Sequence, residues 1–327
     1  MESTTPSPPS SPEAPKPRPV SRWPDRIFVG FVGIVGAGVL ALALAIVAIL
    51  VYSARSSFNR FGLAFLWGST WNPQTEVFGV LPFVAGTLIT SAIALLVAVP
   101  LALGSAIFIT TQAPRFLRGP VGTAIELLAA VPSVIYGLWG IYVIHPLMES
   151  TVEPWLKQYL GWTGLFSGPA IGLDVLTAGL ILAVMIVPTI CAVSRDTLLA
   201  VPESQREAAL SLGATSWETT RVSMLPYARS GIVGGVILGL GRALGETMAV
   251  TMVIGNIDKV PTSLLSPGQT IASLIANELL SSISSLQVAA ILECGLVLLA
   301  ISLLVNVAAR VLVWRVSGGR VVGVGVL

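Results

Sequence analysis

Long apolar stretches alternate with short polar segments along most of the chain. A helix needs about 20 apolar residues to cross the hydrocarbon core of a bilayer, and six stretches reach that length. They are Ile27–Tyr52, Val80–Thr110, Val121–His145, Ile171–Val193, Gly231–Gly255 and Val288–Ala309. The pattern therefore predicts an all-α fold, a polytopic membrane helical bundle with six transmembrane helices.

The flanks of these stretches set the domain limits. Residues 1–24 contain eight prolines and almost no large apolar side chains, so we expect a disordered tail. Residues 25–327 form the predicted transmembrane domain. Its first apolar stretch is too long for a signal peptide and is expected to remain as a span.

Composition supports the membrane assignment. The 327 residues are 54% hydrophobic and only 10% charged, whereas soluble domains carry roughly 25% charged residues. The single histidine and two cysteines give no metal-site pattern. Cys191 and Cys294 lie within apolar stretches, where packing is the expected role.

The positions of the Lys and Arg residues give an orientation. If six spans alternate, thirteen of the 18 basic residues fall on one side. These are Lys16, Arg18, Arg22, Arg26, Arg115, Arg118, Arg195, Arg206, Arg221, Arg229, Arg310, Arg315 and Arg320, against Arg55, Arg60, Lys157 and Lys259 on the other side and Arg242 inside a span. The positive-inside rule then places both termini in the cytoplasm.

Three outer connections follow from this orientation. Those at 53–79 and 146–170 contain tryptophans, which favour the membrane interface, so we expect short interfacial helices or a docking surface there. The third, 256–287, carries an amphipathic stretch at Ile271–Leu280. Prolines Pro100, Pro132 and Pro188 interrupt three spans, which fits bent helices around a path and also plain bundle irregularity.

The most specific cytoplasmic feature is the segment 201–226. Pro202 and Glu203 suit a helix start, and Gly213 suits its end. Thr215 and Glu218 have the spacing of a capping box, so a second short helix should follow at once. The segment is therefore predicted to be a helix–turn–helix on the cytoplasmic face.

This segment resembles the EAA loop of bacterial ABC importer permeases, in which a short coupling helix docks on a separate ATPase subunit. The matching residues are Glu207, Ala208, Ala209, Gly213, Leu225 and Pro226. Ser223 departs from the apolar residue that many members have there. The resemblance implies that 195–226 is the coupling loop.

The chain has no nucleotide site of its own by sequence. A P-loop needs a Gly-Lys pair, and Lys16, Lys157 and Lys259 follow Pro, Leu and Asp. We therefore expect no enzyme activity, no catalytic residues and no bound cofactor in this chain, with ATP and Mg used by a partner ATPase.

Ionisable residues inside spans are candidates for function. In the fifth span, Gly231, Gly235, Gly239, Arg242 and Glu246 fall on one face at 100° per residue. The glycines allow close approach of another helix. This face is predicted to point into the bundle, with Arg242 and Glu246 able to meet as an i,i+4 pair.

The third span carries a similar stripe. Glu126, Ala130, Ser133, Gly137 and Gly140 share one face by the same arithmetic. Glu126 lies near the cytoplasmic end, so its charge is either solvated there or part of a path or gate. Glu293 in the sixth span is a further candidate.

Two longer strings resemble one branch of the family. Residues 126–140, ELLAAVPSVIYGLWG, and 239–256, GLGRALGETMAVTMVIGN, resemble the PstC-type permeases of bacterial phosphate ABC importers. The resemblance implies the type I ABC importer permease fold and a location in the bacterial plasma (inner) membrane. It also implies a second related permease (PstA-like), an ATPase homodimer (PstB-like), an external phosphate-binding protein (PstS-like) and no nucleic acid.

In that family the Arg/Glu pair is implicated in phosphate passage, and the matching residues are Arg242 and Glu246. Arginine offers bidentate donors to an oxyanion. Hydrogen phosphate carries an O–H group that can donate a hydrogen bond to a carboxylate, whereas sulfate has no such group. The other interpretation of Arg242 and Glu246 is a structural salt bridge, and the two roles can coexist.

Two alternatives remain for the function. One is an ABC importer permease for another solute, such as sulfate, molybdate or an amino acid. The other, from a different class, is a channel or proton-coupled secondary transporter that uses Arg242 and Glu246 as a relay. The EAA loop argues against the second, because such a protein has no ATPase to dock.

Overall fold

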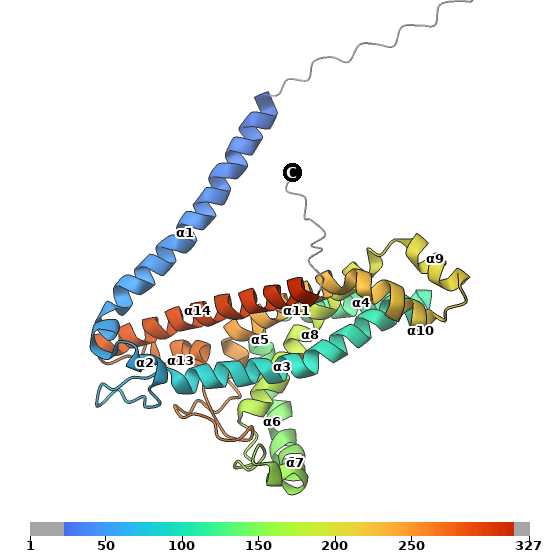
Figure 1. The fold of residues 1–327 in the computed structure, drawn as a ribbon. Helices are drawn as coiled ribbons and strands as arrows, with labels where there is room; N and C mark the ends of the chain where they lie inside the picture. Colours follow the sequence, from blue (N-terminus) through green and yellow to red (C-terminus); the bar gives the residue numbers. More distant parts are fainter. Residues whose placement is uncertain (1–22, 317–327) are drawn as a thin grey trace, which may run out of the picture. The chain divides into compact units, whose positions relative to one another are not determined.

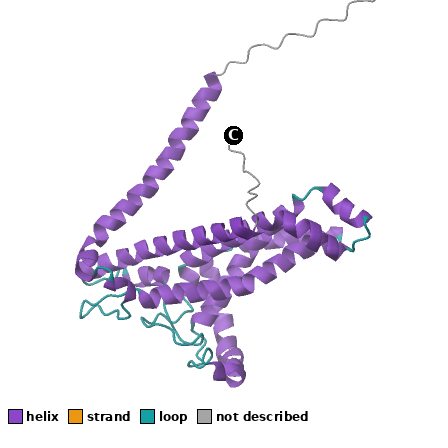
Figure 2. Ribbon diagram, in the orientation of Figure 1, coloured by secondary structure: helices purple, strands orange, loops and turns teal. Residues whose placement is uncertain are grey.

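A computed structural model describes residues 23–316 (Figures 1 and 2). All but the end of the predicted tail 1–24 lies outside the described residues. Every helix or strand element between residues 23 and 316 is a helix, as the apolar pattern predicts. Contacts divide the chain into two units, 1–49 and 50–327, and the boundary falls inside the first helix, α1 (Trp23–Phe61).

The described part of the first unit is the amino-terminal part of α1. Its apolar window has a mean hydropathy of 3.0. Apolar residues lie on every side of this helix, which is the pattern of a helix surrounded by lipid.

The second unit contains the other long helices. α3 (Leu81–Ile107) continues into the π-helical turn η1 (Phe108–Gln112), and α10 (Ser216–Thr219) continues through η5 (Thr220–Met224) into α11 (Leu225–Gly245). α8 (Val175–Leu199) and α14 (Ser285–Val316) complete the set. With α1, five helices of residues 23–316 are long and apolar enough to span a membrane.

The sixth predicted span is bent. α4 (Arg115–Ala130) and the helical run that starts with α5 (Ser133–Trp139) meet at 93°. Counting this pair as one crossing gives six, in agreement with the sequence. The prediction of one continuous helix over Val121–His145 is wrong, because Pro132 cannot donate the next helical hydrogen bond and its φ of −59° and ψ of 141° turn the chain.

Two other predicted spans have different limits. The fifth was expected to reach Gly255, but α11 ends at Gly245 and a separate short helix, α12 (Met248–Thr251), follows. The fourth starts later than predicted, because the Asp174 side chain accepts from the Thr177 N–H at 2.7 Å and fixes the start of α8. Pro100 and Pro188 lie inside continuous helices.

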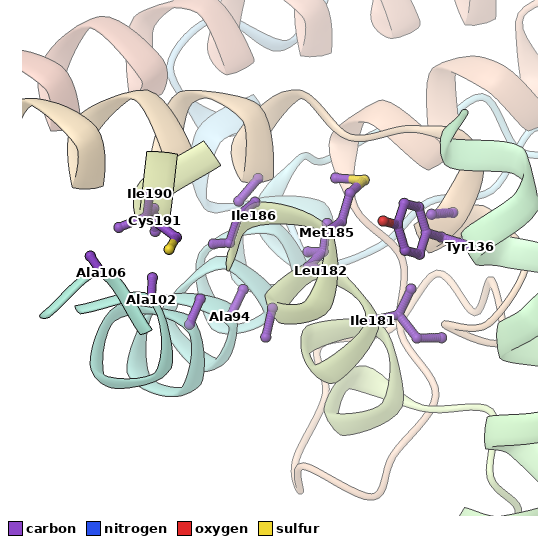
Figure 3. Close-up of a cluster of buried hydrophobic side chains, with 14 of the residues drawn as sticks. Ala94, Ala102, Ala106, Tyr136, Ile181, Leu182, Met185, Ile186, Ile190 and Cys191 are labelled. Atoms are coloured by element: carbon purple, nitrogen blue, oxygen red, sulfur yellow. The ribbon is translucent and has the colours of Figure 1, made fainter. Parts of the chain in front are cut away.

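The main core lies around α8, which packs on α3 and α11 (Figure 3). Large side chains of α8 are fully buried, including Leu182, Met185 and Ile186. They meet small residues of α3 that recur every four positions and so share one helical face: Ala94, Ala98, Ala102 and Ala106. Cys191 is buried in this core, as expected of a packing role.

The connections 53–79 and 146–170 contain short helices, as their tryptophans led us to expect, and 256–287 contains one at its amphipathic stretch. These helices are α2 (Ala64–Trp67), the run α6 (His145–Leu147), η3 (Met148–Val152), α7 (Glu153–Leu160) and η4 (Gly161–Thr163), and α13 (Ile271–Glu278). α2 and α13 lie at one end of the bundle, and α9 (Glu203–Ser211) and α10 lie at the other (Figure 1). The first turn of α13, Ile271–Leu274, is buried.

Candidate functional site

Arg242 and Glu246 lie on either side of a helix end. α11 stops at Gly245, and Glu246 has an extended backbone with φ −69° and ψ 129°. The expectation that the two side chains share one helical face is therefore wrong, because the 100° spacing holds only while the helix continues. No Arg242–Glu246 ion pair within 4.0 Å is present in the part of the chain that the structure describes.

Each of the two residues has a different partner. Nη1 of Arg242 donates to Oγ1 of Thr189 at 3.3 Å, which joins α11 to α8 next to Pro188. Oε1 of Glu246 accepts from the backbone N–H of Ala249 at 3.1 Å, at the start of α12. Both side chains are half-buried. Sequence reasoning missed Thr189, whose only signal is its place directly after a proline inside a span.

The break between α4 and α5 is stabilised by a tyrosine. In a continuous helix the carbonyl of Leu128 would accept from the N–H of residue 132, but Pro132 has none. The hydroxyl of Tyr136 donates to this carbonyl at 2.8 Å instead, beside a longer bond of 3.3 Å from the Val131 N–H. Ser133 is the first residue of α5, directly after the break, and is half-buried.

The segments that follow the two breaks pack together. An added Cβ at Gly137 of α5 would lie 3.2 Å from Cα of Ala249 in α12 and 2.5 Å from Sδ of Met252. Gly140 similarly approaches Val253. The glycines of the third span are thus used for contact with the end of the fifth span, so the two interrupted spans are neighbours in the bundle.

The glycine face of α11 points into the bundle, as predicted. A Cβ at Gly239 would lie 2.7 Å from Cγ1 of Ile190, and one at Gly235 would lie 3.1 Å from Cβ of Val193. At Gly231 it would overlap Thr197. All three contacts are with α8, so the face packs against a helix and not against a cavity.

Glu126 is held by an ion pair that the sequence did not reveal. Nη2 of Arg195 lies 2.8 Å from Oε1 of Glu126, and the same nitrogen lies 3.1 Å from Oδ1 of Asp196. The Glu126 side chain is 56% exposed, so its charge is both solvated and paired. The pair links α4 to α8 at the end of the bundle nearest α9, away from Arg242. In the sequence, this ion pair was indicated only by the presence of opposite charges near the predicted cytoplasmic ends of the third and fourth spans.

The predicted helix–turn–helix is confirmed. α9 ends before Gly213, whose φ is +85°. Thr215 and Glu218 form both hydrogen bonds of the capping box. The hydroxyl of Ser223, where the resemblance led us to expect an apolar side chain, donates to the carbonyl of Gln205 at 3.2 Å and ties α9 to η5.

The remaining residues of the EAA resemblance lie on or beside this segment. Glu207 and Ala208 of α9 are exposed, and no residue of α9 is fully buried. Ala209 is half-buried, and Leu225 and Pro226 begin α11. The helix therefore presents a surface that the chain itself does not cover.

Glu293 of α14 is 2% exposed, and its Oε2 has no hydrogen-bond partner among the described residues. It lines a cavity with Phe58 and Leu66, and Arg242 is not part of that lining. Within residues 23–316, no group of three or more His, Cys, Asp or Glu side chains is placed to hold a metal ion.

Comparisons with known proteins complete the description. Residues 98–318 match the family model described as the binding-protein-dependent transport system inner membrane component. The phosphate transport system permease protein PstC of Pasteurella multocida is 49% identical over 283 residues, which are 85% of this chain and 88% of that protein. The PstC protein of Haemophilus influenzae is 44% identical over 299 residues, covering 90% and 95%.

Solved structures show the same architecture. A chain of a bacterial alginate ABC transporter, in complex with an alginate pentasaccharide-bound periplasmic protein, superposes with a TM-score of 0.60. That match covers 91% of this chain and 99% of that chain at 17% identity. A chain of the MetNI methionine ABC transporter gives a TM-score of 0.51 with 76% and 99% coverage. At 17% identity, both likenesses concern the fold alone.

Proposed function

The chain belongs to the binding-protein-dependent transport system inner membrane components, and within them to the PstC-type permeases, and we propose that it forms half of an ATP-driven import path for inorganic phosphate. Its fold is that of a type I ABC importer permease. It is a multi-pass membrane protein. We place both termini and the loop 195–226 in the cytoplasm, from the distribution of Lys and Arg.

The placement of Arg242 carries the proposal for the path. Its guanidinium is half-buried among helices, and within residues 23–316 it donates to the neutral hydroxyl of Thr189 and to no carboxylate. Guanidinium has five N–H donors, so most of them are available to an oxyanion. A phosphate would gain charge-assisted, bidentate hydrogen bonds there.

Glu246 supplies discrimination in this proposal. Oε1 of its carboxylate is engaged by the Ala249 N–H, which fixes the side chain at the start of α12. The second oxygen can accept a hydrogen bond from the O–H group of hydrogen phosphate. Sulfate has no such proton, so it would meet only repulsion. Ser133, at the start of α5, and Glu126, farther along α4, are the other path residues that we propose.

Coupling to ATP hydrolysis would run through the exposed helix α9. We propose that Glu207, Ala208 and Ala209 dock on a separate ATPase, with Gly213 closing the helix and Leu225–Pro226 leading into α11. The Ser223–Gln205 hydrogen bond joins α9 to η5, so a displacement of α9 is transmitted to the span that carries Arg242. ATP and Mg would be bound by that partner.

The proposed assembly pairs this chain with a second, PstA-like permease. A PstB-like ATPase homodimer would sit on the cytoplasmic side, and a PstS-like external protein would deliver phosphate. Purification of the tagged full chain from native membranes in mild detergent tests this assembly. We expect all three partners to be recovered, and recovery of the chain with no ATPase would contradict the coupling role.

Transport by the purified complex in proteoliposomes tests the substrate. We expect ATP-dependent accumulation of radiolabelled phosphate that excess unlabelled phosphate suppresses and excess sulfate does not. Equal transport of sulfate would overturn the assignment to phosphate. Uptake that persists without ATP, driven by a proton gradient, would instead favour the secondary-transporter alternative.

A further inference from the structure

Two carboxyl side chains far apart in the sequence are buried together at the start of α8. Glu153 belongs to the first turn of α7, and Asp174 is the residue that caps α8. Both are 0% exposed. Neither residue belongs to a motif that the sequence singled out. Buried carboxyls without a cationic partner are rare, because removal of an ionised carboxylate from water costs several kcal/mol.

Each carboxyl has one oxygen that is hydrogen-bonded to the backbone. Oε2 of Glu153 accepts from the Gly172 N–H at 2.9 Å, and Oδ1 of Asp174 accepts from the Thr177 N–H at 2.7 Å. The other two oxygens, Oε1 of Glu153 and Oδ2 of Asp174, are buried and have no donor among the described residues when both groups are ionised. Neither carboxyl forms an ion pair within 4.0 Å among the described residues.

Glu153 is hydrogen-bonded to Gly172, two residues before Asp174, and its charge acts on Asp174, so the two carboxyl groups are adjacent and a hydrogen bond between them would complete the site. Ionised carboxylates only accept hydrogen bonds, so this hydrogen bond requires a proton on one of them. Burial, and to a smaller extent the charge of Glu153, raises the pKa of Asp174 to about 7, while the backbone N–H of Thr177 opposes the rise. A proton shared by the two carboxyl groups removes one of the two negative charges and supplies the hydrogen-bond donor that the free oxygens lack.

We propose that Glu153 and Asp174 form a binding site for a single proton, which fastens α7 to the start of α8. Loss of the proton leaves two buried negative charges in contact, and the segment from α7 to Gly172 is then released from α8. This site lies at the end of α8 opposite the one that leads to α9. With the orientation given under the proposed function, this end of α8 faces the exterior and the pair senses external pH; proton binding by the pair does not depend on that orientation.

The pH dependence caused by other titratable groups on the adjoining elements must be distinguished from that of the pair. His145 donates to the Ile171 carbonyl and lies 3.8 Å from Glu149, and Lys157 donates to the Gly168 carbonyl. In the loop after α12, burial and the charge of Glu278 raise the pKa of Asp258 to about 6, and Lys259 is exposed beside it. Asp258 contributes a pH dependence of the same sign, so variants of the pair itself are needed.

The sign of the expected effect follows from linkage. The folded-state pKa of Asp174, about 7, lies above the unfolded value near 3.9. The folded chain therefore holds an extra proton between these values, so the stability that the pair confers falls as the pH rises from about 4 to about 7 and levels off above the folded-state pKa. Carboxamide variants keep the shape and supply an N–H donor that does not titrate.

The test is the melting temperature of the full chain in detergent from pH 5 to pH 8. We expect the melting temperature of the unmodified chain to fall over this range by several degrees more than those of Glu153→Gln and Asp174→Asn. Either variant should be the more stable chain at pH 8. Glu149→Gln is the matched control, because it removes a nearby exposed carboxylate and should keep the slope of the unmodified chain.

Three results would overturn the proposal. One is an unmodified chain whose melting temperature does not fall with pH, a measurement that needs no variant. Another is a slope that both carboxamide variants share with the unmodified chain. The third is stabilisation at fixed pH by sodium or calcium salts but not by choline chloride, which would assign the site to a metal cation. None of these measurements depends on phosphate transport, so failure of the proposed function would leave them interpretable.

Discussion

The guanidinium of Arg242 donates to the hydroxyl of Thr189 at 3.3 Å, across the packed faces of α11 and α8. The acceptor is neutral and the distance is long for such a bond. An anion that offers two charged oxygens is a stronger partner for the same group. The contact therefore holds the arginine in position without neutralising it.

Replacement of Arg242 by lysine should lower phosphate uptake by about 10-fold or more, because a point charge cannot reproduce two parallel hydrogen bonds. Uptake into proteoliposomes at fixed ATP is the measurement. Thr189→Val is the control, since it removes only the neutral acceptor and should change uptake far less. Normal uptake by Arg242→Lys would remove the argument for bidentate binding.

Replacement of Glu246 by glutamine separates charge from capping. The amide oxygen still accepts from the Ala249 N–H, so the melting temperature should stay close to that of the unmodified chain. Phosphate uptake should fall, and discrimination against sulfate should weaken. Glu246→Ala should show the same transport defect together with a loss of about 1 kcal/mol of stability from the missing cap. Unchanged uptake by a folded Glu246→Gln variant would contradict the proposed role.

Replacement of Tyr136 by phenylalanine should destabilise the chain by about 1 kcal/mol, because the Leu128 carbonyl loses the donor that replaces the missing N–H of Pro132 and keeps only the 3.3 Å bond from the Val131 N–H. Denaturant-induced unfolding in micelles is the measurement. Tyr142→Phe is the matched control, because Tyr142 is 75% exposed. Equal stability of the two variants would show that the Tyr136 hydroxyl is not needed at the break.

Replacement of Gly231 by alanine should cost about 1–3 kcal/mol, because the added Cβ would overlap Thr197 and force α11 away from α8. Gly241→Ala is the control on the same helix. Nothing lies within 4 Å of a Cβ at Gly241, so alanine there should be neutral or stabilising by up to about 1 kcal/mol. The melting temperatures of both variants measure how much the close packing of α11 against α8 contributes to stability.

Replacement of Gly213 by alanine should weaken the coupling of ATP hydrolysis to transport. The φ of +85° costs an L-residue about 1–2 kcal/mol, although the space for the side chain is open. The amount of phosphate moved per ATP hydrolysed should fall while the bundle keeps its melting temperature. Gly234→Ala, in an open position on α11, should leave that ratio unchanged.

The sequence was sufficient to predict the features that depend on local pattern. The spans follow from apolar length, the turn at Gly213 from its neighbours, and the capping box from the spacing of Thr215 and Glu218. The inward direction of the glycine face also follows from helical periodicity, since Gly231, Gly235 and Gly239 lie within one unbroken helix.

Features that depend on where a helix stops could not be predicted in this way. Arg242 and Glu246 have i,i+4 spacing, but α11 ends between them, where the chain makes a contact with α5 that local sequence does not specify. Pro100, Pro132 and Pro188 look alike in the sequence, yet only Pro132 lies at a break. The pairing of Glu153 with Asp174, and of Glu126 with Arg195, depends on tertiary contacts between separate helices.

The break at Pro132 has a mechanical consequence. α4 is attached to α8 through Glu126 and Arg195, and α5 is attached to α12, so each half of the bent pair moves with a different part of the bundle. A change of angle between the halves needs only rotation about a few backbone torsions, and it costs neither helix a hydrogen bond. The Tyr136–Leu128 hydrogen bond connects α5 to α4 across this break. Its length therefore limits the range of angles that the two helices can adopt while the bond is kept.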